Sequence, residues 1–287
     1  MNINNQILSV LERATKALEK ISKLNNANKI KISDANGYLW SSESFELIPI
    51  KNINAIDIHL LKGIDHTKSI LIENTSQFSD GYPANNVLLW GARGMGKSSL
   101  VKSVHKVISS KSKNNRLILI EIFRDDIKTL PVLMSQLNNF KHRFIIFCDD
   151  LSFDNNENNY KSLKTILDGG ITERTENIIF YATSNRRHLM PRSMIENEKS
   201  TAISPSESAE EKISLSDRFG LWLGFYQCSQ DEYLSMIQSY ASYFNLEIKD
   251  NELKELAIEW SVTRGSRSGR VAWQFIQDMA GKLKTKI

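Results

Sequence analysis

The chain has 287 residues, of which 41% are hydrophobic and 24% are charged. These proportions are typical of soluble globular domains, so they exclude wholesale disorder, and the length allows a sizeable buried core. The formal net charge of +4 is compatible with nucleic-acid contact, but so small a charge over such a surface makes only a weak field.

Export and membrane residence are not indicated by the sequence. The N-terminal stretch MNINNQILSVLERATKALEK reaches Glu12 before any usable hydrophobic region, unlike a secretory signal. The longest apolar runs, such as LILI and FIIFC, have the length of a strand and are too short to cross a bilayer. Cys148 and Cys228 lie in apolar runs without metal-ligand spacing, which predicts buried reduced thiols. We therefore expect a cytoplasmic protein with no membrane contact.

Residues 1–50 are predicted to form a separate helical and polar appendage. A polar stretch rich in Asn and Lys follows an apparent amphipathic helix, and a second helical segment covers residues 56–78 before the turn signal DGYPANN. The apolar residues at three- and four-residue spacings in the first helix are Ile7, Leu8, Leu11, Ala14 and Leu18.

Residues 51–228 alternate between strand-like and helix-like segments. Short apolar runs rich in β-forming residues indicate strands buried on both faces. Helix-like stretches at 97–109 and 159–170 lie between them, which is the βαβ pattern of a parallel sheet with helices on both faces. We expect an α/β fold with a five-stranded parallel sheet, whose strands cover 86–90, 117–123, 143–149, 177–183 and 221–226.

The chain after residue 228 is predicted to form a small helical lid over 229–287. Ser229 and Glu232 have the spacing of a capping box at the start of the first of several amphipathic helices. Before the last strand, the polar connection between Leu189 and Ser216 is either a functional loop or a disordered one.

A phosphate-binding loop is predicted where the strand 86–90 meets the helix 97–109. The sequence GARGMGKS fits the pattern G-x-x-x-x-G-K-S, with the strand before it and the helix after it that this motif requires. Its glycines let successive N–H groups face a phosphate, Lys97 would pair with the β- and γ-phosphates, and Ser98 would bind Mg²⁺. The expected nucleotide contacts are Gly91, Ala92, Arg93, Gly94, Met95, Gly96, Lys97, Ser98 and Ser99.

Two carboxylates, Asp149 and Asp150, stand at the carboxyl end of the strand 143–149, at the edge where open α/β sheets bind ligands. Asp149 would hold Mg²⁺ through its water shell, and Asp150 would polarise the attacking water. The alternative is a pair of solvated loop carboxylates. The next strand ends in polar residues, and we assign the contact with the γ-phosphate and its water to Asn185, with Thr183 and Ser184 as alternatives. Asn185 could also simply form a turn.

Arg218 immediately precedes the last strand, so it lies at the amino edge of the sheet, opposite its own phosphate loop. An arginine placed there could serve the nucleotide of a neighbouring subunit more easily than its own. The alternative is a surface salt bridge with the Glu-rich stretch upstream.

In this order, GARGMGKSS, FIIFCDD, ATSN, SDRFG and TRGSRSGRVAWQF resemble the Walker A, Walker B, sensor 1, arginine finger and sensor 2 elements of the AAA+ ATPases. The stretches PANNVLLWGARG, FCDDLSF, YATSNRRHL and LSDRFGLWL resemble an uncharacterised bacterial AAA+ family catalogued as a domain of unknown function. The resemblance runs from about Leu60 to the C-terminus. It implies an αβα P-loop ATPase core with a helical lid, ATP and Mg²⁺ as ligands, and a ring-like or stacked homo-oligomer.

The resemblance also implies roles for residues outside the phosphate loop. It places the adenine-side contact at Gly63 and Ile64, the arginine finger at Arg218, and the second sensor at Arg270, with Arg267 as the alternative. One departure is Asp150, where typical members carry Glu. Its shorter side chain puts the water-activating role in question.

The sequence therefore predicts an ATPase whose hydrolysis of ATP changes the conformation of an unidentified protein or nucleic-acid partner. A nucleotide-gated loader with little turnover is the alternative, and the departure at Asp150 favours it. A small-molecule phosphotransferase would need an acceptor pocket, and the finger-like Arg218 and the helical lid argue against it.

Overall fold

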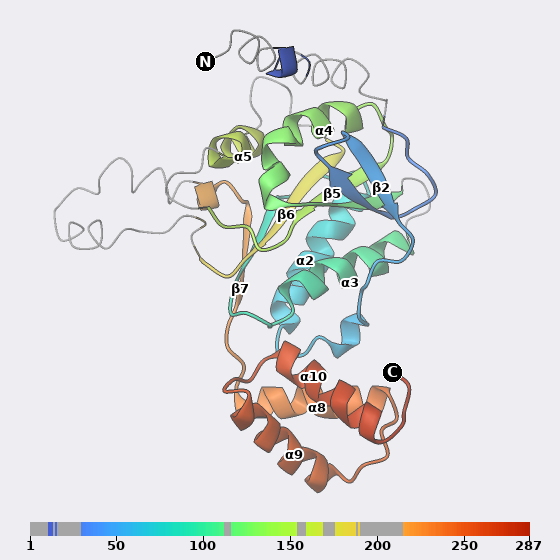
Figure 1. Cartoon of the computed structure of the whole chain (residues 1–287), viewed down its shortest axis with the longest axis vertical. Helices are drawn as coiled ribbons and strands as arrows, with labels where there is room; N and C mark the ends of the chain where they lie inside the picture. Colours follow the sequence, from blue (N-terminus) through green and yellow to red (C-terminus); the bar gives the residue numbers. More distant parts are fainter. Residues whose placement is uncertain are drawn as a thin grey trace, which may run out of the picture.

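The computed structural model describes residues 11–13, 15, 30–111, 116–153, 159–168, 176–187, 189 and 215–287. Its centre is a seven-stranded sheet with the order β2-β1-β4-β5-β6-β3-β7 (Figure 1). All neighbouring strands are parallel except the β1–β2 pair. The strands are β1 (Gly37–Ser41), β2 (Glu46–Ile50), β3 (Val87–Gly91), β4 (Leu117–Ile122), β5 (Arg143–Cys148), β6 (Ile178–Ser184) and β7 (Leu221–Phe225).

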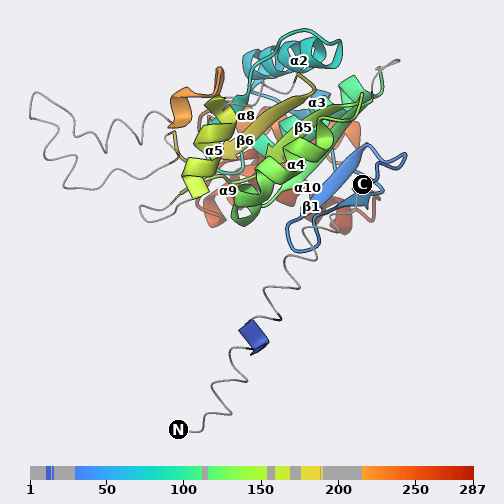
Figure 2. The ribbon, with the colours of Figure 1, turned by 90° about the horizontal axis from the view of Figure 1, so that it is seen from above.

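Helices cover both faces of this sheet, because the central strands present apolar side chains on both sides. Helices α2 (Asp65–Ser79) and α3 (Lys97–Ser109) cover one face, where Leu89 of β3 lies in their core. Helices α4 (Leu130–Leu137) and α5 (Asn159–Asp168) cover the other, where Leu88 lies. Figure 2 shows α2 and α4 on opposite sides of the sheet. The predicted αβα core is confirmed.

The expected number of strands was too low, because the sequence analysis placed residues 37–50 in the N-terminal appendage. Strands β1 and β2 instead form a hairpin at the β4 edge of the sheet, where Gly37–Leu39 of β1 pair with β4. Trp40 is 1% exposed, and its indole Nε1 donates to Oγ1 of Thr129 at 2.8 Å. The hairpin is thus tied to the core by pairing and packing.

The helix expected over 56–78 is interrupted. A short 3₁₀ helix, η1 (Ile58–Leu60), precedes α2, and Gly63 between them has a φ of 74°, which a regular helix cannot contain. A second 3₁₀ helix, η2 (Arg124–Thr129), leads directly into α4. The break at Gly63 turns the chain so that Ile64 is buried.

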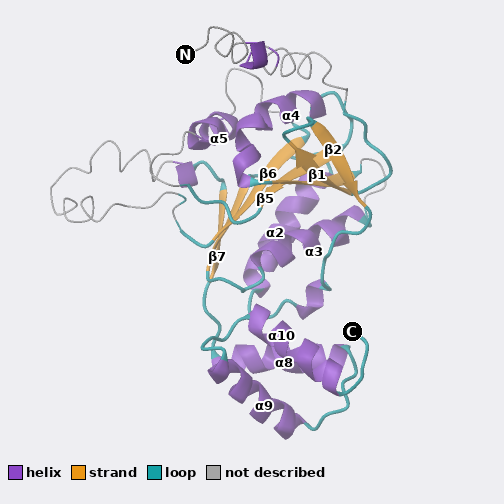
Figure 3. Ribbon diagram, in the orientation of Figure 1, coloured by secondary structure: helices purple, strands orange, loops and turns teal. Residues whose placement is uncertain are grey.

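The C-terminal part is a lid of three helices, α8 (Gln230–Tyr243), α9 (Asp250–Thr263) and α10 (Gly269–Lys282), which lies below the sheet in Figure 3. The predicted capping box is confirmed: the N–H of Glu232 donates to Oγ of Ser229, and the N–H of Ser229 donates to the Glu232 carboxylate. The buried residues of the lid join the same core as α2 and α3, so the lid packs toward that face.

Most of the helix expected in the first 20 residues, and most of the connection between Leu189 and Ser216, lie outside the described residues. Within the described ranges, no helix combines the length and the apolar character that a bilayer span requires.

Candidate nucleotide-binding site

The phosphate loop joins β3 to α3, and its backbone depends on three glycines. Gly91, Gly94 and Gly96 have φ values of 121°, 74° and 88°, a region that residues with a Cβ rarely adopt. At Gly91 a Cβ would also stand 2.0 Å from the carbonyl oxygen of Phe225. Gly96 is the N-cap of α3, so the positive end of that helix faces the loop.

Lys97 lies at the start of α3 and is 7% exposed. Its Nζ donates to the carbonyl oxygens of Gly91 at 2.9 Å and Ala92 at 2.8 Å, and to Oδ1 of Asn185 at 3.1 Å. Burial lowers the pKa of Lys97, while the negative charges of Asp149 and Asp150 oppose that change. The ammonium group is therefore held at the mouth of the loop, where a phosphate would lie.

Asp149 follows β5 and accepts two hydrogen bonds at the same oxygen. The hydroxyls of Ser98 and Thr183 each donate to Oδ1 of Asp149 at 2.5 Å. Serine hydroxyl and carboxylate oxygens are hard donors that suit Mg²⁺, which usually takes one or two protein ligands and completes its shell with water and phosphate. The arrangement of Ser98 beside Asp149 therefore fits the cation expected from the sequence.

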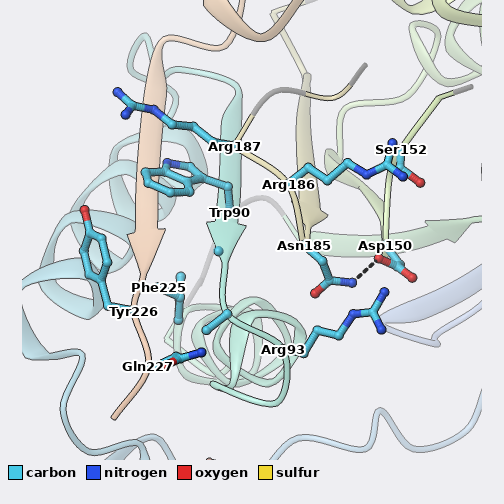
Figure 4. Close-up of a pocket in the computed structure, with 12 residues that line it drawn as sticks. Trp90, Arg93, Asp150, Ser152, Asn185, Arg186, Arg187, Phe225, Tyr226 and Gln227 are labelled. Atoms are coloured by element: carbon cyan, nitrogen blue, oxygen red, sulfur yellow. Dashed lines mark hydrogen bonds between the residues drawn. The ribbon is translucent and has the colours of Figure 1, made fainter. Parts of the chain in front are cut away.

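Asp150 has a φ of 52°, an uncommon backbone conformation that Asp tolerates better than most residues. Its N–H donates to Oγ1 of Thr183 at 2.9 Å, and its Oδ1 accepts a 2.6 Å hydrogen bond from the amide of Asn185, which Figure 4 shows as a dashed line. Asp150 thus projects toward β6 and the phosphate loop, although solvent still reaches it.

Strand order explains why these residues meet. β6 pairs with β3 on one side and with β5 on the other. The carboxyl ends of the three strands therefore bring Lys97, Asp149 and Asn185 to one edge. Ser184, the other alternative to Asn185, is fully buried, and its Oγ accepts from the N–H of Arg186 at 3.1 Å.

A cavity of about 860 Å³ contains this edge. One end is charged: Arg93, Lys97 and Arg270 line it together with Asp149 and Asp150, whose charges act on Lys97. The other end is largely apolar and is formed by η1, the start of α2 and the lid, with Ile56, Leu60, Leu61, Ile64, Met236, Tyr240 and Trp273. A cavity with a cationic end and an apolar end fits a nucleoside triphosphate, whose phosphates are charged and whose base is flat and apolar on its faces.

The lid meets the phosphate loop through α10. The N–H of Arg270 donates to the carbonyl oxygen of Gly94 at 3.0 Å, and a Cβ at Gly94 would stand 2.9 Å from Oγ of Ser268. The side chain of Arg270 borders the 860 Å³ cavity. Arg267, the alternative second sensor, borders a different cavity of about 660 Å³ beside Cys228.

Arg218 lies apart from this site. It is half-buried and precedes β7, whose Leu221 pairs with Val87 at the start of β3, whereas the phosphate loop follows Gly91 at the end of β3. The length of β7, about 13 Å at 3.3 Å per residue, therefore separates Arg218 from the loop along the sheet. Gly63 is also outside the cavity, and the nearest side chain to it is that of Glu232.

Some contributions to the site were not predicted from the sequence. Thr183 is 2% exposed, and its hydroxyl both donates to Asp149 and accepts from the N–H of Asp150, so it positions the acidic pair. The sequence placed Thr183 at the correct edge but could not show which group it contacts. Tyr240 of α8 and Trp273 of α10 carried no local signal of a ligand site, because each belongs to the pattern of its own amphipathic helix.

The fold is that of the P-loop nucleoside triphosphatases, in the arrangement of the AAA+ ATPases. Its features are a phosphate loop at the carboxyl edge of a parallel sheet, an acidic pair two strands away and a helical lid. A family model described as "Protein of unknown function (DUF815)" matches residues 33–283, and the chain belongs to that family.

Two solved structures illustrate the fold. The chain is similar to the Thermotoga maritima RuvB Holliday junction branch migration motor, with 20% identity and a TM-score of 0.51. It is also similar to the Aeropyrum pernix ORC1 protein in complex with DNA, with 14% identity and a TM-score of 0.56. Each alignment covers 80% of this chain and 66% of the other, slightly less than two thirds of those proteins. No curated protein is significantly similar.

Proposed function

We propose that the protein is a Mg²⁺-dependent ATPase of the AAA+ type, whose hydrolysis of ATP changes the conformation of a protein or nucleic-acid partner. The observation that carries the proposal is the connection of Lys97 to Asp150 through the side chain of Asn185, inside a cavity with a cationic and an apolar end. This connection brings a phosphate-binding cation together with a carboxylate able to orient water.

Each group at the charged end has a role in this proposal. The N–H groups of the phosphate loop and Lys97 bind the β- and γ-phosphates, and Arg270 contributes a further positive charge from the lid. Ser98 and Asp149 would hold Mg²⁺, which would supply positive charge to neutralise the phosphates. Asp150 orients and polarises the attacking water, and Asn185 keeps the Asp150 carboxylate in place.

We further propose that copies of the chain assemble into a ring-like or stacked homo-oligomer. The separation of Arg218 from its own phosphate loop supports this proposal, because an arginine at the opposite edge could reach only the nucleotide of a neighbour. We assign recognition of the partner to residues 1 to about 50, apart from the hairpin of β1 and β2, which belongs to the sheet.

A nucleotide-gated loader that binds its partner in the ATP state and turns over little is the second candidate. It is favoured by Asp150, which has a shorter arm than the Glu of typical AAA+ proteins. ATP-dependent partner binding without measurable ATP turnover would support the loader.

The experiment that tests the nucleotide site compares thermal unfolding with and without Mg·ATP. Ligand at a hundred times its Kd should stabilise the wild type by about 2.7 kcal/mol, and Lys97→Ala should lose this effect. Lys102→Ala is the matched control, because Lys102 lies on the same helix but pairs with Glu121 outside the cavity. A wild-type melting temperature that does not respond to saturating Mg·ATP would contradict the proposal.

A further inference from the structure

A second cavity, of about 530 Å³, lies next to the nucleotide cavity at the carboxyl ends of β3, β6 and β7 (Figure 4). Asp150, Asn185 and Arg93 border both cavities. The proposed function uses only the nucleotide cavity and assigns nothing to this one. Its lining residues are Trp90, Gly91, Ala92, Arg93, Asp150, Ser152, Asn185, Arg186, Arg187, Phe225, Tyr226 and Gln227.

The second cavity is strongly basic. Arg93, Arg186 and Arg187 line it and are exposed, whereas Asp150 is the one carboxylate among its lining residues. Within the part of the chain that the structure describes, none of these three arginines forms an ion pair. Figure 4 shows Arg186 and Arg93 on the side of Asp150, and Arg187 on the opposite side, beside Trp90. Positive charge therefore lies on both sides of the cavity, which favours binding of an extended anion.

The same cavity has an aromatic wall. The guanidinium of Arg187 lies over the ring of Trp90, 5.3 Å from its centroid, and the Trp90 and Tyr226 rings meet edge to face at 5.9 Å. Figure 4 shows Arg187 beside Trp90, and Tyr226 just beyond the end of the neighbouring strand. Tyr226 is 73% exposed although it is large and partly apolar. Its ring is therefore available to a flat partner.

Arginines beside an exposed aromatic ring match single-stranded nucleic acid, because guanidinium groups bind phosphates in two-pronged hydrogen bonds and unpaired bases stack on aromatic rings. An acidic polypeptide would satisfy the arginines but would gain little from Tyr226. A duplex would offer phosphates but no free base faces, since its bases are already stacked.

We propose that this cavity binds single-stranded nucleic acid, with one backbone phosphate on Arg186, another on Arg187, and a base on the ring of Tyr226. The inference rests on the proposed function in one respect, because it identifies the partner of the proposed ATPase as nucleic acid. It concerns a separate cavity and is tested separately. Because Asp150 and Asn185 border both cavities, a strand bound here lies next to the groups that we assign to hydrolysis.

Fluorescence anisotropy of a labelled oligothymidylate with the full chain tests the proposal, with and without a non-hydrolysable ATP analogue. Tyr226→Ala should weaken binding by about tenfold, within the range known for base stacking on aromatic side chains. Arg187→Ala should weaken it and reduce the slope of log affinity against log salt by about 0.7, the value of one lost phosphate contact with a single strand.

Matched controls are available on the lid. Arg264 stacks on Trp260 at 4.7 Å, as Arg187 does on Trp90, and Tyr243 is 53% exposed, but neither lines the second cavity. Arg264→Ala and Tyr243→Ala should bind the oligonucleotide as the wild type does. Melting temperatures without ligand check that each variant is folded.

Several results would overturn the proposal. These are no binding by the wild type at low salt, equal binding by all four variants, or equal affinity for a duplex. If polyglutamate displaces the oligonucleotide while Tyr226→Ala leaves the affinity unchanged, that pair of results would identify an acidic polypeptide as the ligand instead. The Mg·ATP thermal shift, measured on the same samples, separates these results from a failure of the nucleotide site.

Discussion

The side chain of Asn185 contacts Asp150 and Lys97 at once: its amide donates to Oδ1 of Asp150 at 2.6 Å, and its oxygen accepts from Nζ of Lys97 at 3.1 Å. Asn185 directly follows β6, which lies between β3 and β5, the strands that precede Lys97 and Asp150 in the chain. A change in the position of the Lys97 ammonium group, such as phosphate binding would cause, therefore acts directly on the side chain that holds Asp150.

Asp150→Asn should retain ATP and lose hydrolysis, because the amide keeps the size of the side chain but cannot accept a proton from water. We expect the Mg·ATP thermal shift to persist while the turnover number falls at least about 10²-fold. Asn185→Ala should lower turnover in the same direction, with Ser184→Ala, a buried neighbour on the same strand, as its control. Equal turnover by Asp150→Asn and the wild type would remove the water-orienting role from Asp150.

Arg270 and Arg267 should differ in their effect on ATP affinity. Arg270 borders the nucleotide cavity, so Arg270→Ala should raise the Kd for Mg·ATP by about tenfold, the value of one charged hydrogen bond. Arg267→Ala should leave it unchanged, since Arg267 borders a different cavity. Isothermal titration calorimetry measures both constants. A larger increase in the Kd for Mg·ATP with Arg267→Ala than with Arg270→Ala would assign the second sensor to Arg267.

Arg218 should act on the nucleotide of a neighbouring subunit. Arg218→Ala should bind ATP almost normally but hydrolyse it about 10³-fold more slowly, the effect of removing an arginine finger. Mixing this variant with Lys97→Ala should recover some activity, because a mixed pair can place an intact Arg218 beside an intact phosphate loop. Asp217→Ala, which changes an exposed neighbour, is the control. If size analysis shows mixed assemblies that remain inactive, Arg218 does not act in trans.

His105 should make the fold sensitive to acid. It is 1% exposed, its Nε2 donates to the carbonyl of Leu117 at 3.0 Å, and its Nδ1 has no partner among the described residues. Burial lowers the pKa of His105 from 6.5 to about 4. Between these two pH values, His105 is protonated in the unfolded chain but neutral in the folded chain. The free energy of unfolding therefore falls as pH drops from about 6.5 to about 4.

The corresponding loss is about 3 kcal/mol, at 1.36 kcal/mol per pKa unit. His105→Gln keeps a donor for Leu117 but cannot titrate, so its urea-unfolding free energy should fall less between neutral pH and pH about 4. His59→Gln, which changes an exposed histidine, is the control. Identical pH dependence of the wild type and His105→Gln would contradict the effect assigned to His105.

Features encoded by contiguous residues were predicted well from the sequence. The predicted helix 97–109 matches α3, and the strand that ends before Asp149 was placed within one residue, because apolar periodicity and the glycine pattern are local signals. The hairpin formed by residues 37–50 was missed, because each of its two strands has only five residues, too few for a clear periodic pattern. The hairpin is stabilised by the pairing of β1 with β4, and this long-range contact cannot be predicted from a local sequence pattern.

The details of the site depended on tertiary structure in the same way. Thr183 reaches Asp149 only because β5 and β6 pair with Cys148 opposite Ala182, a register that the sequence does not state. Likewise, Trp273 enters the cavity from a helix far along the chain. The sequence located the phosphate loop and Ile64, which both line the cavity, but gave no sign that Tyr240 and Trp273 line it too.

The hydrogen bond from the N–H of Arg270 to the carbonyl oxygen of Gly94 joins main chain to main chain. The bond therefore tolerates any residue at 270 except proline, which would remove the donor. At 94 it requires glycine, because a Cβ there would stand 2.9 Å from Oγ of Ser268. Because α10 shares its apolar core with α8 and α9, the three helices should follow any displacement of that one carbonyl group. A substitution of Arg270 other than by proline should therefore alter the charge in the cavity while the main-chain link between the lid and the phosphate loop persists.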